Sequence, residues 1–486
     1  MSGTEASISA AESYKDLREW LSLVEKAGEL RCVDGVEPDL EIGELASLVC
    51  HSRNNPAVLC DRLKGVEGGY RVLLNALGSR RRLSLSLRLP LPEDEVHFVR
   101  LWKEKVKTIS LIPHVKVESS PVTKNRVMGK DIDIRRFPAP TWNLHDGGPY
   151  IGTGCCVITR SPEDGWVNVG TYRAMLHGPD ALGFYAEPGR HGRLHREQWW
   201  KQGKPCPVAV VLGCDPLVFI VSSLNLPAGT CELDYAGGIK GEPVETIEEP
   251  MTGLPVPASA ECVIAGESAE GDLLAEGPFG EWTGYYGSER SPQPVIRIKS
   301  ILYRDEPIIF GRPPIKPPSS QAHTQGLLRS ALLWNYLESA GLTGIKGVWL
   351  HEAGGGSLFS VISVRQKYPG HATQVGIVAA QCGVGIRNGR YVVVVDDDID
   401  PADLEEVVWA ICTRSDPERS AQVIRRSFSS PLDTGVLPNA VHSSRLVLDA
   451  CKPYERIHSF PQAVKTDPER MARARKKWGF LVSPKE

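Results

Sequence analysis

The chain has 486 residues, of which 41% are hydrophobic and 24% charged, with a formal net charge of −3 at pH 7. This length predicts about two or three domains of a globular protein. The small negative charge excludes strongly basic nucleic-acid-binding classes, so we expect no nucleic acid partner. No signal peptide and no run of about 18 apolar residues is present, which predicts a cytoplasmic protein without membrane insertion.

The twelve cysteines are scattered along the chain, and none forms a CxxC pair. Cys155 and Cys156 are adjacent, so on a strand they point to opposite faces and do not readily chelate one metal ion. Most of the cysteines have apolar neighbours. We therefore expect reduced core thiols in a reducing compartment, with neither disulfides nor zinc.

The N-terminal region, residues 1–114, predicts an α/β unit. Residues 13–28 place apolar side chains at helical spacing and end at Gly28, and a second helix is expected near residues 40–50. Residues 56–60 and 70–77 have the pattern of buried strands. The arginine-rich run at 79–92 predicts a loop or a helix start with exposed arginines.

Residues 115–312 have a different pattern. Short β-rich runs alternate with turn residues, as in IGTGCCVITRS, PVAVVLG and PVIRIKSILYR. Such runs predict an antiparallel barrel or sandwich rather than βαβ units.

Residues 320–450 alternate helical and strand patterns again, which predicts an α/β layer domain. Pro401 is expected to open the helix of DPADLEEVVWAICTRS, after the strand RYVVVVDDDID. The tail, residues 451–486, contains a charged helix near 465–478. A solvated or partner-packed surface helix is the simplest interpretation of that pattern.

Two carboxylates flank a tight turn in Glu276-Gly-Pro-Phe-Gly-Glu281. The glycines and the proline forbid a regular helix through this segment, so both side chains can reach one spot. Two close carboxylates raise the pKa of one of them, and a carboxyl protonated near pH 7 is what general-acid catalysis requires. Taken alone, the pair also fits a solvated loop.

The segment from Trp166 to Met175 predicts a strand carrying one amide, Asn168, and one guanidinium, Arg173. An arginine beside paired carboxylates would orient one of them, and it could also bind a substrate carboxylate.

Asn168, His191 and Glu232 could supply oxygen, nitrogen and oxygen ligands, a set that suits Mn²⁺ or Mg²⁺. Their spacing does not show that they converge, and a lone histidine is more often structural. We interpret His177, His195 and His323 as structural, with His195 on a helix surface.

Several segments together resemble the UbiD-type decarboxylases, a family that includes ferulic acid decarboxylases and bacterial aromatic-acid decarboxylases. The resemblance runs through nearly the whole chain, and the combination of two motifs is its most specific part. The matching segments are DLREWLSLVEKAGEL, FPAPTWNLHDGGPYIGTG, NVGTYR, SSLNLPAGTCELDYAGG, EGPFGEWTGYY, GRPP, VVVVDDDIDPADLEEVVWA and SSPLD, of which NVGTYR and EGPFGE are the most specific pair.

The resemblance implies an N-terminal α/β region, a central split β-barrel that binds prenylated FMN, and a C-terminal α/β oligomerisation domain of a homodimer. It places a Mn²⁺ (or Mg²⁺) ion on Asn168, His191 and Glu232, and K⁺ near Ser222, Ser223 and Glu232. Flavin prenyltransferase is the implied supplier of the cofactor. The implied cofactor-binding residues are Asn168, Val169, Gly170, Thr171, Tyr172, Arg173, Arg190, His191 and Glu232.

The implied reaction is reversible, non-oxidative decarboxylation of an aromatic, heteroaromatic or α,β-unsaturated carboxylic acid through a covalent prenylated-flavin adduct. Glu281 would donate the proton, Arg173 would orient Glu281 and the substrate, and Glu276 would hold Arg173. A carboxylase running the same chemistry in reverse, a non-catalytic flavin-binding protein and an ordinary FMN oxidoreductase are the alternatives.

The chain departs from the ferulic acid branch at Val384, where that branch has a lysine that reaches the flavin phosphate. The segments from Pro314 to His323 and from Ser430 to Val436, which would line the substrate site, also differ. Cinnamic-type specificity is therefore not expected.

Overall fold

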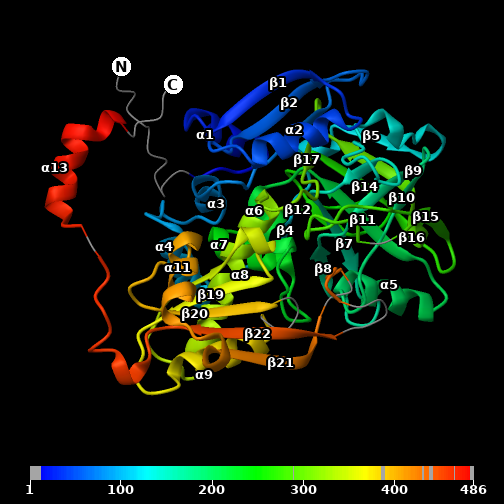
Figure 1. Ribbon diagram of the computed structural model, residues 1–486. Helices are drawn as coiled ribbons and strands as arrows, with labels where there is room; N and C mark the ends of the chain where they lie inside the picture. The colour runs from blue at the N-terminus through cyan, green and yellow to red at the C-terminus, as the bar shows by residue number, and fades with distance from the viewer. Residues whose placement is uncertain are drawn as a thin grey trace.

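The computed structural model describes residues 13–287, 289–384, 389–429, 432–436, 442–464 and 466–481. It has three parts, each built around a sheet (Figure 1). The blue strands of the N-terminal sheet lie above a large central sheet, and the C-terminal sheet, in yellow to red, lies below (Figure 1). The expected order of an α/β region, a β-rich region and a second α/β region is confirmed.

The N-terminal sheet has the order β1-β2-β3-β17, so its last strand comes from the far end of the central region. Helix α1 ends as expected, with Gly28 at a positive φ of 74° just beyond it. The expected second helix and both strands are also present. The elements are α1 (Leu17–Lys26), β1 (Leu30–Val36), α2 (Glu41–Cys50), β2 (Ala57–Leu63), β3 (Arg71–Leu74), α3 (Arg80–Ser86), α4 (Glu95–Thr108) and β17 (Ile308–Gly311).

The expectation of exposed arginines in residues 79–92 was wrong. Arg82, on α3, is fully buried, and its guanidinium donates to the Ala76 carbonyl at 2.9 Å and to the Glu29 carboxylate at 2.7 Å. Ser79 caps α3 by accepting from the Arg82 N–H. A buried arginine with several oxygen acceptors cannot be distinguished by sequence pattern from a solvated one.

The central sheet has ten strands, and its pairings are antiparallel. Its main path is β6-β9-β10-β16-β14-β11-β7-β8, with β5 and β15 paired to the long β16. Alternate residues of β11 enter two core clusters on opposite faces. The strands are β5 (Asn125–Met128), β6 (Tyr150–Gly152), β7 (Cys155–Arg160), β8 (Val167–Gly170), β9 (Ala174–His177), β10 (Ala181–Gly183), β11 (Cys206–Leu212), β14 (Cys262–Ser268), β15 (Leu273–Glu276) and β16 (Ser291–Tyr303).

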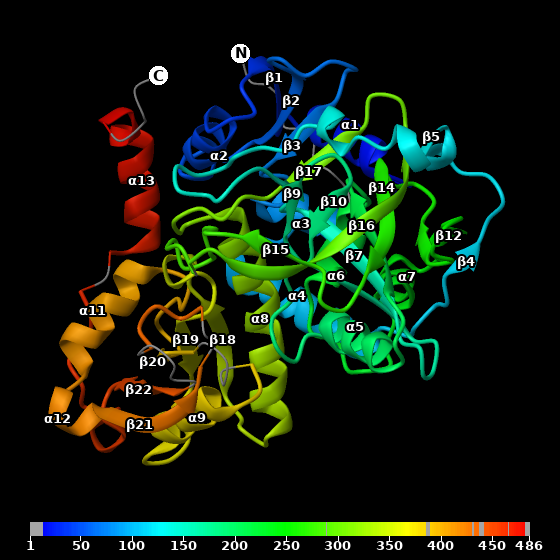
Figure 2. The same ribbon diagram turned by 90° about the vertical axis from the view of Figure 1, so that its right-hand side faces the viewer.

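Three helices interrupt this β-rich region and carry residues toward the sheet. Helices α5 (His191–Lys201), α6 (Pro216–Ser222) and α7 (Glu232–Lys240) contact β7 or β8. A small sheet of β4 (Val115–Lys116), β12 (Glu245–Glu248) and β13 (Pro255–Pro257) lies beside α7 (Figure 2). The first residue of α5 and the first residue of α7 therefore both lie near one end of the central sheet.

The C-terminal sheet has the order β18-β19-β20-β22-β21 and is mixed. Its central strand, β20, is buried except at its first residue, as an apolar run of valines requires. The elements are α8 (Ser320–Ser339), β18 (Ile345–Leu350), β19 (Phe359–Val364), α9 (His371–Gln381), β20 (Tyr391–Asp396), α11 (Leu404–Arg414), α12 (Pro417–Ser420), β21 (Ala421–Phe428) and β22 (His442–Ala450).

Pro401 does not open α11, contrary to expectation. The helix begins at Leu404, and the Asp403 side chain accepts from the Glu405 and Glu406 N–H groups. Asp403 is the better cap because its carboxylate accepts hydrogen bonds from the helix N-terminus. The expected tail helix is α13 (Pro468–Trp478), which has no buried residue and stands away from the rest of the chain (Figures 1 and 2).

Helix α4 joins the N-terminal region to the C-terminal domain, because it packs on α8 and β18. Lys103 of α4 donates to Glu338 of α8 at 2.7 Å. None of the twelve cysteines, all of them among the described residues, is assigned to a disulfide, and nine of them are buried. In the described part of the chain, no helix combines the length and apolar character needed to cross a membrane.

Candidate active site

Arg173 and Glu276 form a buried, bidentate ion pair. Glu276 is the last residue of β15, and Arg173 lies in the short link between β8 and β9 rather than on the expected strand. Arg173 Nε is 2.8 Å from Glu276 Oε1, and Nη2 is 3.2 Å from Oε2. The carboxylate is 2% exposed. The two matched contacts fix the plane of the guanidinium.

Glu281 contacts the same guanidinium through Arg173 Nη1. It lies in the turn that connects β15 to β16, and its backbone N–H donates to the Tyr285 carbonyl at 2.8 Å. The turn approaches the chain at Gly147, where a Cβ would lie 1.9 Å from the Gly277 carbonyl oxygen. The expected convergence of both carboxylates on one spot is therefore present.

The two carboxylates have different surroundings. Burial raises the pKa of Glu281 to about 7, although the Arg173 guanidinium opposes that rise. The Arg173 pKa is itself raised, because the attraction of Glu276 and Glu281 outweighs the opposing desolvation. Glu281 can thus carry a proton near neutral pH and lose it readily, which are the properties of a general acid.

Aromatic side chains surround the guanidinium. The Tyr150 hydroxyl donates to Glu276 Oε1 at 2.9 Å, and the Tyr150 and Phe279 rings stack with centroids 4.0 Å apart. Arg173 Cζ lies 4.1 Å from the centre of the Tyr185 ring. These contacts hold Arg173 from several sides and exclude water from its ion pairs.

A cavity of about 660 Å³ opens on this network. Its wall includes residues from the central sheet, from α8 and from the segments after α9 and β21. The part of the wall next to Arg173 consists largely of aromatic side chains, whereas the part formed by α8 has both polar and apolar side chains. Residues of this wall include Thr171, Tyr172, Arg173, Tyr185, Glu187, Arg190, Phe279, Glu281, Trp282, Arg312, Pro314, Gln321, Gln325, Arg329, Val384, Phe428 and Leu432.

Two of the residues expected to bind a metal ion lie on elements that adjoin this wall in the chain, close to Thr171 and Arg190. Asn168 is on β8, His191 is the first residue of α5, and Glu232 is the first residue of α7. Glu232 Oε2 accepts from the Val169 N–H at 2.7 Å, which ties α7 to the strand that carries Asn168. Burial raises the pKa of Glu232, and Arg190, next to His191, opposes that rise only in part.

In the group formed by Asn168, His191 and Glu232, no paired cation compensates the carboxylate charge among the described residues. Glu232 is 3% exposed and has no ion-pair partner among the residues that the structure describes, and its burial raises its pKa to about 7. The amide nitrogen of Asn168 is also buried, and it has no hydrogen-bond partner among the residues that the structure describes. Burial lowers the pKa of His191, so its imidazole is neutral near pH 7. A carboxylate, an amide and a neutral imidazole fit a divalent cation.

His195 is not on a helix surface, because it is 1% exposed and contacts Thr159 Oγ1 through Nδ1 at 3.0 Å. It packs against Trp166, which also packs against His191. His323 contacts Glu352 through Nδ1 at 2.5 Å, and His177 is half-buried. Ser430 lies outside the described residues, whereas Leu432 from the same predicted substrate segment lines the cavity.

Models of three domains of one family match the chain. The 3-octaprenyl-4-hydroxybenzoate carboxy-lyase N-terminal domain matches residues 21–99, the Rift-related domain 114–317 and the C-terminal domain 322–450. The chain belongs to the UbiD family of carboxy-lyases. It is 30% identical over 455 residues to a phenolic acid decarboxylase of Bacillus subtilis, covering 91% of this chain and 93% of that protein.

Two further relatives agree with this assignment to the UbiD family. The chain is 32% identical to a pyrrole-2-carboxylic acid decarboxylase of Pseudomonas aeruginosa over 83% of its own length and 84% of that protein. The UbiD-class enzyme HmfF of Pelotomaculum thermopropionicum, solved with FMN, superimposes with a TM-score of 0.84 at 28% identity, over 94% of this chain and 99% of that one. HmfF has also been solved with prenylated FMN.

Some residues of the site were missed by the sequence interpretation. Tyr150 lies within the matched segment FPAPTWNLHDGGPYIGTG, but nothing in the sequence pairs it with Glu276. Tyr185 and Glu187 follow β10 in a segment that has no motif. Only the antiparallel register of β6, β9 and β10 brings these residues beside Arg173.

Proposed function

We propose that this UbiD-family enzyme decarboxylates an aromatic or heteroaromatic carboxylic acid, with Glu281 as the proton donor. The observation that carries this proposal is the pair of carboxylates on Arg173 at the cavity wall, one of them with a pKa raised to about 7. The decarboxylases among its relatives act on phenolic and pyrrole carboxylic acids. Tyr185, Phe279, Trp282 and Phe428 give the cavity aromatic surface for such a ring.

Each residue has a separate task in this proposal. Arg173 binds the substrate carboxylate and keeps Glu281 in position, while Glu276 keeps Arg173 in position. After CO₂ leaves, the Glu281 carboxyl donates its proton to the carbon that lost the carboxylate. Glu281 is then an anion beside Arg173, and water restores its proton. The reverse order of the same steps is carboxylation, and the concentration of CO₂ decides the direction.

Prenylated FMN, when bound, would supply the electron sink for loss of CO₂. Arg190 and the segment from Thr171 to Arg173 line the cavity proposed for the flavin. The other proposed cofactor-binding residues are Asn168, Val169, Gly170, His191 and Glu232, of which the first three directly precede Thr171 and His191 directly follows Arg190. Asn168, His191 and Glu232 would hold Mn²⁺ or Mg²⁺, which would supply positive charge for the anionic cofactor. The region of Ser222, Ser223 and Glu232 is the proposed K⁺ site. Val384 lines the same cavity without offering a charge.

We further propose a homodimer in the cytoplasm, supplied with cofactor by a flavin prenyltransferase. The domains are assigned as residues 1–114, a split-barrel flavin domain at 115–312, an oligomerisation domain at 320–450 and a tail at 451–486. The buried free thiols favour a reducing compartment. The match to HmfF, which is known in an evolved dimeric form, is consistent with a dimer.

The decisive experiment replaces Glu281 by Gln in enzyme co-expressed with a flavin prenyltransferase. The amide keeps the shape and the contact with Arg173 but has no acidic proton. Turnover should fall by roughly 10²–10⁴-fold, the typical contribution of a general acid, with flavin content unchanged. Glu289→Gln, at an exposed glutamate after the same turn, is the matched control. Turnover of Glu281→Gln within about threefold of wild type, far below that contribution, would contradict the proposal.

A further inference from the structure

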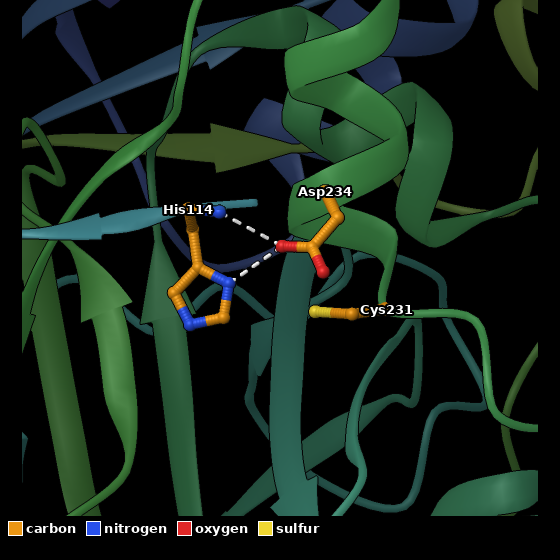
Figure 3. Close-up of side chains that lie close together, drawn as sticks. All are labelled: His114, Cys231 and Asp234. Carbon is orange, nitrogen blue, oxygen red and sulfur yellow. Dashed lines mark hydrogen bonds and ion pairs between the residues drawn. The ribbon is translucent and has the colours of Figure 1, made fainter. Parts of the chain in front are cut away.

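Three potential metal ligands of different chemistry meet away from the cavity, where the start of β4 approaches the first turn of α7. They are His114, just before β4, Cys231, which precedes α7, and Asp234 in its first turn. One ligand atom from each lies within 4.8 Å of the other two (Figure 3). Cys231 is buried and the other two are half-buried.

Backbone hydrogen bonds hold the segment of His114 against the start of α7, which carries Asp234. Asp234 Oδ1 accepts from the His114 backbone N–H at 2.9 Å and contacts His114 Nδ1 at 2.7 Å. The Asp234 carbonyl accepts from the Ile112 N–H at 3.1 Å, and the Val115 N–H donates to the Val244 carbonyl at 3.0 Å. The imidazole therefore presents Nδ1 toward the carboxylate and the sulfur, as Figure 3 shows.

Cys231 directs its sulfur toward this pair. It occupies the position before α7 where a side chain often caps the helix, but it makes no capping hydrogen bond. Its Sγ instead lies close to the His114 ring and the Asp234 carboxylate (Figure 3). The imidazole, the carboxylate and the thiol thus offer three ligand atoms of different chemistry within 4.8 Å of one another.

We infer that His114, Cys231 and Asp234 form a binding site for a borderline divalent cation of the Zn²⁺ class. Imidazole, thiolate and carboxylate together match the ligands that Zn²⁺ takes in proteins. On binding, the Cys231 thiol proton leaves to water as the sulfur–metal bond forms. The His114 proton moves from Nδ1 through water to Nε2, so that Nδ1 can bind the ion, and the contact between His114 and Asp234 is replaced by bonds to the ion. This site has sulfur, which separates it chemically from Asn168, His191 and Glu232.

The site is open to exchange. The side chains of His114 and Asp234 are 25% and 22% exposed, which leaves room for the ion to enter and for water as a fourth ligand. The ion would join the segment before β4 to the start of α7. Cys231 directly precedes Glu232, so the same ion would fix the backbone from which Glu232 reaches the Val169 N–H.

Cobalt titration of the full-length protein tests this site. The protein is treated with chelator and saturated with Mn²⁺, which occupies any oxygen and nitrogen site, and Co²⁺ is then added. Coordination by Cys231 should produce a sulfur-to-cobalt charge-transfer band that saturates at one ion per chain. Zn²⁺ should abolish the band by competition, since Zn²⁺ takes the same ligands.

Variants assign the band to its ligands. Cys231→Ser should abolish it, and Asp234→Asn, which can still accept from the His114 N–H, should weaken Co²⁺ binding roughly tenfold or more. Cys412→Ser, at an exposed cysteine on α11, should leave it unchanged. The inference is overturned if wild type shows no band at stoichiometric Co²⁺, or if the band persists in Cys231→Ser. The wild-type titration decides the question even if a variant does not fold.

Discussion

Two groups of buried acidic side chains, one at Arg173 and one at Glu232, differ in how their charge is balanced. At Arg173, one guanidinium contacts both Glu276 and Glu281. At Glu232, a buried carboxylate has a backbone N–H as its partner and no ion pair among the described residues. At Arg173, the charges compensate one another without a ligand, and Glu281 can hold a proton. The group at Glu232 fits a cation, because an uncompensated buried charge is costly.

The largest effect should follow a change at the second group. Glu232→Ala or His191→Ala should lose the metal ion and the flavin together, with activity near background, since removing one ligand leaves the cation under-coordinated. Metal analysis and flavin absorbance of the purified variants check this. Glu245→Ala, at an exposed carboxylate on β12, is the control and should keep both.

The difference between the two groups would disappear if Glu232→Ala retained stoichiometric metal. In that case Glu232 would be a structural residue that holds α7 against β8, and the cation would have other ligands.

A smaller effect is expected at the first group. Glu276→Gln should keep flavin and metal but lower kcat by about 10²-fold, the scale of a misplaced catalytic contact. Glu276 also raises the pKa of Glu281, so its neutral replacement should move the pH profile to lower pH. An unchanged pH profile in steady-state kinetics would show that Glu276 has only a packing role.

Much of the fold follows from the sequence because its signals are local. Helix α1 combines an apolar stripe with a terminal glycine, and β20 is an unbroken apolar run. The start of α11 was a local error, because Asp403 rather than Pro401 accepts from the N–H groups of the first turn. Other errors occurred where tertiary contacts decide, since Arg82 is buried among oxygen acceptors from distant segments. The pairing of β17 with β3 is likewise invisible to a local pattern.

The contact of Arg173 with Glu276 and Glu281 was predictable from the family resemblance, but not from residue spacing. Arg173 lies 103 residues from Glu276, and His114 lies 120 residues from Asp234. No periodicity connects positions so far apart. The absence of CxxC pairs predicted no zinc site, whereas the fold brings one cysteine to a histidine and an aspartate.

The pH dependence of turnover further distinguishes the group at Arg173 from the group at Glu232. Because the pKa of Glu281 is raised to about 7, its carboxyl is protonated below that pH and loses its proton above it. The rate should therefore fall as pH rises through about 7, by about tenfold for each further unit. In Glu281→Gln the low residual rate should lose this dependence. A wild-type rate that stays constant from pH 6 to 9, well across this pKa, would contradict the assignment.

The smallest effect is expected at Tyr150, whose hydroxyl supports Glu276 from behind. Tyr150→Phe should lower the free energy of unfolding by about 1–2 kcal/mol, because a buried hydrogen bond to a charged group is lost. Turnover should fall less than tenfold, which corresponds to a rise of less than about 1.4 kcal/mol in the activation free energy. Urea unfolding measures the first quantity. Tyr286→Phe, at a tyrosine that is 38% exposed and whose hydroxyl accepts from the His145 N–H near the surface, should change stability by less than about 0.5 kcal/mol.

The proton donor is tested most directly by hydrogen exchange into the decarboxylated product in D₂O. Proton donation is reversible, so wild-type enzyme should exchange the hydrogen at the carbon that carried the carboxylate, without any CO₂. Glu281→Gln with full flavin occupancy should exchange it at least about 10²-fold more slowly, whereas Glu289→Gln should match wild type. Exchange by Glu281→Gln at the wild-type rate would show that another group delivers the proton.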